Sequence, residues 1–317
     1  MTSKSSGAGP CRPEMLVANR ILSYSGAART FLSLHALSAG FRLDTSRLCA
    51  AAIMAAFPAA DTHTGMIRDL RTILDGWEYE PGKISVRKVI GRDGREKIQT
   101  RIDMGVLQME LDGPPDGRPL DCHDSILEEL ETELRRHLDV YGNDEDFVLS
   151  PEQCIDLRRE AYLYYQRYLS LFVLEDFERV ARDTARNLRV IDLCTKYAAA
   201  PEDRSTLAAQ RSYVLMMHTR SRACAALREQ RHDEALHLVD QGASKLRAAA
   251  AEAVDECAAP QSELRVLTAL REEIISKMPP DSPARLKHEL QFALADEDYE
   301  RAAELRDRLA AVKPRAR

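Results

Sequence analysis

The chain has 317 residues, of which 44% are hydrophobic and 30% are charged, as is typical of a soluble globular protein with a sizeable core. Its formal net charge of −6 argues against a protein that binds nucleic acid through a bulk basic surface. No apolar run approaches the roughly 20 residues that a membrane-spanning helix needs. We therefore expect two or three globular domains, no membrane segment and no direct contact with nucleic acid.

The seven cysteines are scattered and include no Cys-x-x-Cys pair. Their odd number and irregular spacing favour reduced thiols in a cytoplasmic protein over a framework of disulfides. Cys154, Cys194 and Cys224 lie inside helical patterns, where we expect each to act as a small buried hydrophobic side chain.

Residues 1–65 differ in composition from the rest of the chain. They are rich in Ala, Ser, Leu and Arg, and Glu14, Asp44 and Asp61 are their only acidic residues. A transit peptide has this composition, whereas a secretory signal would place its apolar stretch closer to an N-terminal basic region. A well-patterned segment begins at Met66. We interpret 1–65 as an over-extended gene start or a disordered tail, outside the folded unit.

Residues 66–122 carry the signals of a small β element. Apolar and β-branched residues recur at even positions over 84–90 and again over 98–102, on either side of the turn dipeptide Asp93-Gly94. Alternation around such a turn predicts a β-hairpin. An isolated hairpin is marginal in water, so this one is expected to pack on helices.

Residues 105–124 contain the strongest candidate for a catalytic or metal site. We place a bulge at Gly105, because alternation resumes over 107–111 with the opposite parity. The loop that follows carries acidic residues beside a Cys-His pair: Asp112, Asp116, Asp121, Cys122, His123 and Asp124. Their spacing matches no standard zinc or calcium loop. We therefore predict no catalytic residue, no metal and no cofactor, and we keep an enzyme with its site in 105–124 as an alternative.

Residues 123–278 form the predicted helical domain. An apolar stripe over 126–138 predicts a first helix that ends near Gly142. Ser150 and Gln153, with Pro151 at the first helical position, make a capping box that begins the next helix. Further helices are expected over 177–197, 204–229 and 232–258, and after Pro260.

Two of these helix pairs are alike, which suggests a repeat. The segments 174–181 and 228–235 each contain a short charged turn that leads into the next helix. The second resembles the middle of a tetratricopeptide repeat, in which small residues flank a polar turn. The helices are longer, however, and their spacing of roughly 50 residues exceeds the 34 of that repeat. We expect a repeat-like antiparallel array, with Ala235 packed at a helix crossing.

A polar group lies on the helix predicted over 177–197. Arg179, Asp183, Thr184 and Asn187 fall on one side of that helix, among other arginines. One interpretation is a solvated face with ion pairs four residues apart, each worth roughly 0.2–0.5 kcal/mol. The other is a polar stripe that lines a concave binding surface, where Thr184 and Asn187 would supply hydrogen bonds.

A linker at 279–283 isolates the last segment, 284–317. Its prolines push the residues before them away from helical dihedral angles. Two apolar stripes flank the acidic turn 296–298, which predicts an antiparallel helical hairpin. The expected internal core consists of Leu286, Leu290, Tyr299, Ala302 and Leu305. A core of about 30 residues is too small to be robust alone, so a partner or a second copy is expected to complete it.

The same segment resembles the UVR motif, the helical hairpin named for the UvrB and UvrC repair proteins. The residues that match its pattern are Leu286, Leu290, Ala293, Tyr299, Glu300, Ala302, Ala303, Leu305, Arg306 and Asp307. Leu290 replaces a usual Met, and Tyr299 a usual Phe. The resemblance implies a contact module without catalytic residues, which associates with another UVR hairpin or occurs in Clp-type ATPases and their regulators. The matching residues other than Glu300 are the predicted partner-binding set. For Arg306 and Asp307, an equal alternative is that they only lie on the solvated surface of the helix.

These observations predict a mainly α-helical protein: an antiparallel, repeat-like helical array with a small N-terminal β-hairpin and a C-terminal helical hairpin. The function that we favour is a non-catalytic adaptor or scaffold in the cytoplasm, whose array holds one partner while its hairpin docks another. An accessory factor of nucleotide-excision repair, recruited through UVR pairing, is the alternative from a different class.

Overall fold

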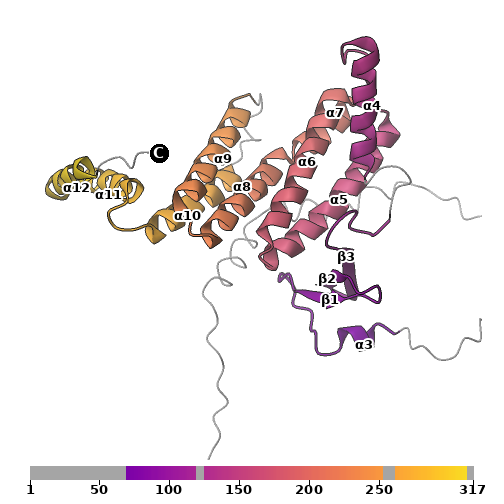
Figure 1. The fold of residues 1–317 in the computed structure, drawn as a ribbon, viewed down its shortest axis with the longest axis horizontal. Helices are drawn as coiled ribbons and strands as arrows, with labels where there is room; N and C mark the ends of the chain where they lie inside the picture. The colour runs from indigo at the N-terminus through magenta and orange to yellow at the C-terminus, as the bar shows by residue number, and fades with distance from the viewer. Residues whose placement is uncertain (1–68, 119–124, 253–260, 313–317) are drawn as a thin grey trace, which may run out of the picture. The chain divides into compact units, whose positions relative to one another are not determined.

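The protein is mainly α-helical, with a small antiparallel sheet on its N-terminal side, as the sequence predicts (Figure 1). The computed structural model describes residues 69–118, 125–252 and 261–312. The segment 1–65, interpreted as an over-extended start or a tail, lies outside these residues. The boundaries predicted for the other domains stay predictions.

The described chain divides into two compact units, and the division runs through the sheet. The smaller unit contains residues 69–85 and 101–107, with the short helix α3 (Arg71–Leu74). Inside it, the Trp77 indole donates a hydrogen bond of 2.7 Å to the Ser85 hydroxyl, and Arg101 Nε donates one of 3.0 Å to the Trp77 carbonyl. The larger unit holds 86–100 and the described residues from 108 onward.

The sheet has three strands in the order β1-β2-β3: β1 (Val86–Ile90), β2 (Glu96–Ile102) and β3 (Gly105–Glu110). β1 and β2 form the predicted hairpin, with Val86 opposite Thr100 and Ile90 opposite Glu96. Gly94 takes a φ of 74° in its turn, a conformation that glycine adopts without steric cost. The bulge predicted at Gly105 is wrong, because the chain reverses at residues 103–104 and Gly105 begins a third strand.

One face of β2 packs against the helices of the larger unit. Ile98 is fully buried, and the Thr100 hydroxyl lies 2.7 Å from the hydroxyl of Ser170 on α5 (Pro151–Val173). The hairpin therefore has the helical support that its small size requires.

In the larger unit, α5 packs on α6, α6 packs on both α7 and α8, α8 packs on α9, and α9 packs on α10 (Figure 1). Their bounds are α4 (Ile126–Tyr141), α5 (Pro151–Val173), α6 (Phe177–Tyr197), α7 (Pro201–Ala208), α8 (Arg211–Arg228), α9 (His232–Glu252) and α10 (Gln261–Lys277). The capping box predicted for α5 is formed, since Gln153 N donates to Ser150 Oγ and Ser150 N donates to Gln153 Oε1. The sequence thus predicts the start of α5 correctly.

The single helix predicted over 204–229 is wrong. The structure has two helices there, and α7 begins at Pro201, whose ring suits the first helical position. Asp203 in its first turn pairs with Arg158 of α5. α7 ends at Ala208, and α8 begins at Arg211. The fourth predicted helix is described as far as Glu252, and the remainder of 232–258 lies outside the described residues.

Helices α8 and α9 approach closely at Gly242. A β-carbon added to Gly242 would lie 2.4 Å from both Cγ2 and Oγ1 of Thr219, and 2.9 Å from its Cβ. Because Thr219 Cβ is fixed to the backbone, the clash cannot be relieved by rotating the side chain alone. A glycine inside a helix normally weakens it, and here the close packing of α8 on α9 accounts for its presence.

We predict that Gly242→Ala lowers the free energy of unfolding by about 1–3 kcal/mol, although alanine is the better helix former. Urea unfolding measures the change. The double variant Gly242→Ala, Thr219→Ala should regain part of the loss, because it removes two of the three clashing atoms. A stabilised Gly242→Ala protein would show that α8 and α9 do not pack this closely.

Candidate functional site

The C-terminal hairpin consists of α11 (Pro283–Ala295) and α12 (Tyr299–Ala311), which pack on each other. Ser282 caps α11, since its hydroxyl accepts a hydrogen bond from Arg285 N, and Pro283 occupies the first helical position. The Asp298 carboxylate caps α12 by accepting from Arg301 N. The segment 284–317 therefore folds, over its described part, as the predicted antiparallel hairpin.

The hairpin has a small apolar cluster of its own. Its buried members are Leu286, Ala293, Ala302 and Leu305, and Leu290, Leu309 and Val312 pack against them in part. The structure thus brings together most of the core that the sequence predicts. Tyr299 is the exception, because 68% of it is exposed and it takes no part in this cluster.

Several apolar side chains of the hairpin remain open to solvent. Phe292 and Leu294 near the end of α11 are 53% and 51% exposed, and Tyr299 begins α12. Ala303 is exposed as well, and Arg306 and Asp307 pair with each other on the surface. Phe292 and Leu294 were missed by the sequence reasoning, although both are apolar residues that lie off the buried stripe of α11.

The turn of this hairpin recurs in the array. Glu297 takes a left-handed φ of 59°, Glu297 N donates to Leu294 O, and Asp298 N donates to Ala293 O. This pair of hydrogen bonds defines a Schellman cap. The next helix begins directly after it. Glu175 between α5 and α6, and Gln230 between α8 and α9, have φ values of 58° and 59° with the same two bonds.

The recurrence corrects the comparison of 174–181 with 228–235 by one residue. Glu175 and Gln230 occupy equivalent positions, so Leu174 corresponds to Glu229 and not to Arg228. Ala235 is fully buried close to its turn, in agreement with the packing predicted for it. The likeness to a tetratricopeptide repeat itself stays a prediction.

The polar group predicted on α6 belongs to a buried ionic network. Asp183 and Thr184 have no exposed surface, and Asn187 is also buried, so the predicted solvated face is wrong for these three residues. Asp183 accepts two hydrogen bonds, of 2.7 and 2.8 Å, from Nε and Nη2 of Arg167 on α5. Both partners are almost completely buried. Because these three side chains are buried, they do not line an exposed concave surface.

A second buried pair extends the network to α4. Arg186 pairs with Glu160, whose two carboxylate oxygens also accept from the amides of Ile126 and Leu127 in the first turn of α4. A carboxylate is favoured at a helix N-terminus because it satisfies free N–H groups and complements the helix dipole. Asn187 Nδ2 donates a bond of 2.9 Å to the carbonyl of Ala161, which ties α6 to α5 a second time.

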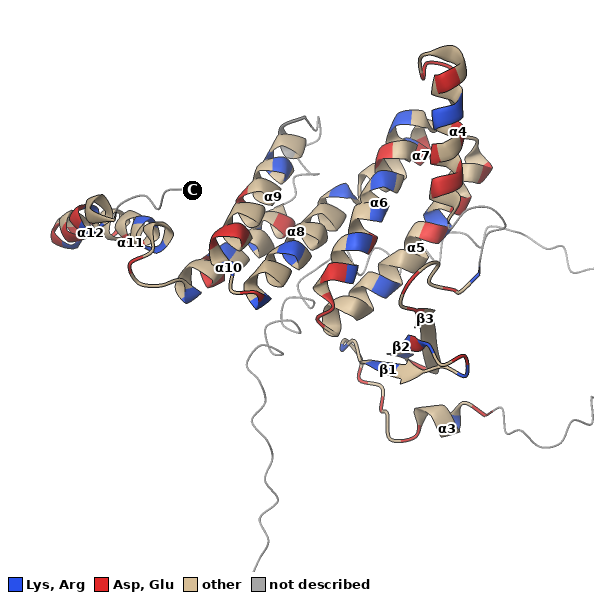
Figure 2. Cartoon of the chain, in the orientation of Figure 1, with Lys and Arg blue, Asp and Glu red and all other residues tan. Residues whose placement is uncertain are grey.

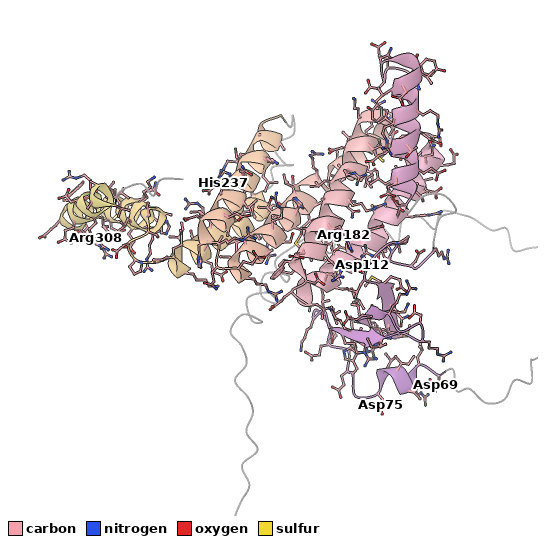
Figure 3. The ribbon with its side chains drawn as sticks, viewed as in Figure 1. Asp69, Asp75, Asp112, Arg182, His237 and Arg308 are labelled. Atoms are coloured by element: carbon pink, nitrogen blue, oxygen red, sulfur yellow. The ribbon has the colours of Figure 1, made fainter. Side chains whose placement is uncertain are left out.

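The network reaches the surface through Arg179 and Arg182. Both guanidinium groups pair with Asp112, in the loop after β3 (Figure 3). Hydrogen bonds from Arg179 lower the pKa of Asp112 to about 2, so this carboxylate is ionised at neutral pH. Acidic and basic residues are interspersed along the neighbouring helices (Figure 2).

In the described part of the loop 105–124, Asp112 and Asp116 are both held in ion pairs. Asp112 is engaged by arginines, and Asp116 pairs with Arg118. Asp121, Cys122, His123 and Asp124 lie outside the described residues. Within the described ranges, His, Cys, Asp and Glu form no group of three or more that could hold a metal ion, and no helix is both long and apolar enough to cross a membrane.

Comparison with known proteins identifies the C-terminal hairpin. Residues 284–313 match the family model of the UvrB/uvrC motif, UVR. The hairpin is a UVR motif. No curated protein and no solved structure matched the chain. The UVR match covers about a tenth of the sequence, and it supports protein–protein contact for the UVR hairpin and for no other part of the chain.

We predict that Asp183→Asn lowers the free energy of unfolding by about 3–5 kcal/mol, because it leaves the buried Arg167 cation without its counter-charge. Urea unfolding at neutral pH measures the effect. Asp156→Asn is the matched control, since Asp156 of α5 pairs with Arg159 at the exposed surface and should change stability by less than about 0.5 kcal/mol. Equal losses in the two variants would contradict the prediction.

Proposed function

We propose that the protein is a non-catalytic adaptor or scaffold, whose helical array holds one partner while the UVR hairpin docks another. The observation that carries the proposal is the UVR hairpin itself. Its apolar cluster is closed within residues of α11 and α12, and Phe292, Leu294 and Tyr299 are left exposed beside it. Exposed apolar side chains grouped on a small element are typical of a protein contact.

We propose a second UVR hairpin, carried by another protein or by a second copy of this chain, as the partner of residues 284–317. A Clp-type ATPase is the other candidate. Either partner would bury apolar surface of the hairpin, which stabilises it by about 25 cal/mol for each Å² buried. This would add to a core that is small for independent stability. The proposal includes a cytoplasmic location, and it includes no cofactor and no direct contact with nucleic acid.

A role as an accessory factor of nucleotide-excision repair is the second candidate. The family description of residues 284–313 favours it, because that motif is named for UvrB and UvrC. In this version the protein reaches DNA only through a UVR-bearing partner. Recovery of a UvrB-type or UvrC-type protein would support the repair role, whereas recovery of a Clp-type ATPase would favour control of proteolysis.

The test of docking is affinity capture from cells of the source organism, read by quantitative mass spectrometry. We expect Phe292→Ser with Tyr299→Ser in the full chain to reduce partner recovery at least tenfold, because both side chains are exposed and should not be needed for folding. Val140→Ser is the matched control, as Val140 of α4 is an equally exposed apolar residue elsewhere. Undiminished recovery by the double variant would refute docking through this surface.

We also predict that removing residues 282–317 lowers the melting temperature of the remainder by no more than a few degrees. The UVR hairpin has its own apolar cluster, and its polar links to the preceding segment include Arg285 to the carbonyls of Ser276 and Met278 and Arg308 to Asp281. Differential scanning calorimetry measures the change. Loss of cooperative unfolding in the shortened protein would show that the UVR hairpin belongs to the core of the array.

A further inference from the structure

Arg220 of α8 is a buried cation without a counter-charge. Arg167, Arg186 and Arg220 are the buried arginines of the described residues, and the first two pair with Asp183 and Glu160. Arg220 is 5% exposed, yet no carboxylate in the described ranges lies within ion-pair distance and no acceptor there takes a hydrogen bond from it. Its guanidinium carbon lies 4.6 Å from the centre of the Phe172 ring. That contact favours the charge but offers no oxygen to five N–H donors.

The surroundings of Arg220 are mostly neutral. Tyr213 and Cys224 lie seven residues before and four residues after it, so all three share one face of α8. Burial raises the pKa of both neighbours, and that of Cys224 reaches about 11, so they are uncharged at neutral pH. Glu273 of α10 is the nearby carboxylate, and it pairs with Lys277 at 2.7 Å.

This arrangement is costly to the fold. Burying a guanidinium without an anionic partner carries a desolvation penalty, which also lowers the pKa of Arg220. The guanidinium nitrogens of Arg220 are nevertheless not completely sealed from solvent. The N–H edge of Arg220 therefore keeps some contact with solvent.

We propose that Arg220 is a binding site for a carboxylate. A planar guanidinium matches a carboxylate with two parallel hydrogen bonds. The site offers one positive charge, and the Glu273 carboxylate nearby would repel a second negative charge. A monoanionic carboxylate therefore fits better than a dianionic phosphate. The hydroxyl of Tyr213, which makes no hydrogen bond to the described residues, is a further donor on the same face.

The carboxylate has two sources that share this chemistry: the chain end or acidic side chain of a partner peptide, and a small free carboxylate. The site lies on the array and is independent of the UVR hairpin. If Arg220 binds no carboxylate, the docking proposal for the UVR hairpin is unaffected. If the UVR hairpin docks no partner, the proposal for Arg220 is unaffected.

Isothermal titration calorimetry on the full chain tests the site. The probes are acetate, tri-alanine with a free C-terminus, the same peptide as its C-terminal amide, and inorganic phosphate. We expect saturable binding of a carboxylate probe and weaker binding of phosphate. If tri-alanine binds more tightly than acetate, the site is assigned to a peptide end. If acetate binds and tri-alanine does not, the site is assigned to a small molecule. Amide binding equal to that of the free acid would overturn the proposal.

Arg220→Met keeps the length of the side chain and removes the charge, and it should weaken carboxylate binding at least tenfold. Arg222→Gln is the matched control, because Arg222 is exposed on the same helix and should bind as the unaltered chain does. Arg220→Lys keeps the positive charge but lacks the planar guanidinium that makes two parallel hydrogen bonds, so it should bind the carboxylate several-fold more weakly. Unchanged binding in Arg220→Met, or the absence of saturable carboxylate binding to the unaltered chain, would overturn the proposal.

The melting temperature gives a second measurement. Without ligand, Arg220→Met should melt at the same or a higher temperature, because it removes an unpaired buried cation. Acetate should raise the melting temperature of the unaltered chain and of Arg222→Gln but not that of Arg220→Met. A lower melting temperature in Arg220→Met together with an unchanged response to acetate would identify Arg220 as a purely structural cation, and would also overturn the proposal.

Discussion

The buried pair between Arg167 and Asp183 is the interaction on which the fold of the larger unit depends. The guanidinium of Arg167 donates to Asp183 on α6, to the carbonyl of Glu110 at the end of β3, and to the carbonyl of Gly113 in the loop that follows. A single side chain on α5 thus fixes the next helix and the end of the sheet. Arg186 and Glu160 repeat the principle and extend it to the start of α4. A buried charge is tolerated only when its donors and acceptors are met, so these elements are specified together.

The UVR hairpin follows a different design. It has no buried ion pair among its described residues, and its core is four buried side chains with three partly buried neighbours. It shares the Schellman turn of the array, with a left-handed Glu297 equivalent to Glu175 and Gln230. The same turn is therefore found both in the array, where burial is extensive, and in a small hairpin, to which a partner can add apolar contacts.

The sequence predicted the features that depend on local pattern. The capping box at Ser150 and the stripes of α11 and α12 are local, and both were placed correctly. The buried network was missed because Asp183 and Asn187 have the spacing of a solvated face, while the partners that bury them lie on α5. The break between α7 and α8 was missed because the chain turns there without glycine or proline. The third strand was missed because Gly105 directly follows the turn at 103–104, and a glycine with a change of parity also fits a bulge in one continuous strand. Tyr299 matched its motif position, but the motif pattern carries no information on which side chains stay exposed.

We infer that the ionic network holds the array together, while the UVR hairpin folds separately and docks a partner. Native-state hydrogen exchange of the full chain, with and without Asp183→Asn, tests it most directly, because exchange reports opening segment by segment. We expect the variant to lose protection across α5 and α6 and in the first turn of α4, while the amides of α11 and α12 exchange as before. An equal loss of protection in α11 and α12 would show that the UVR hairpin does not fold separately from the array.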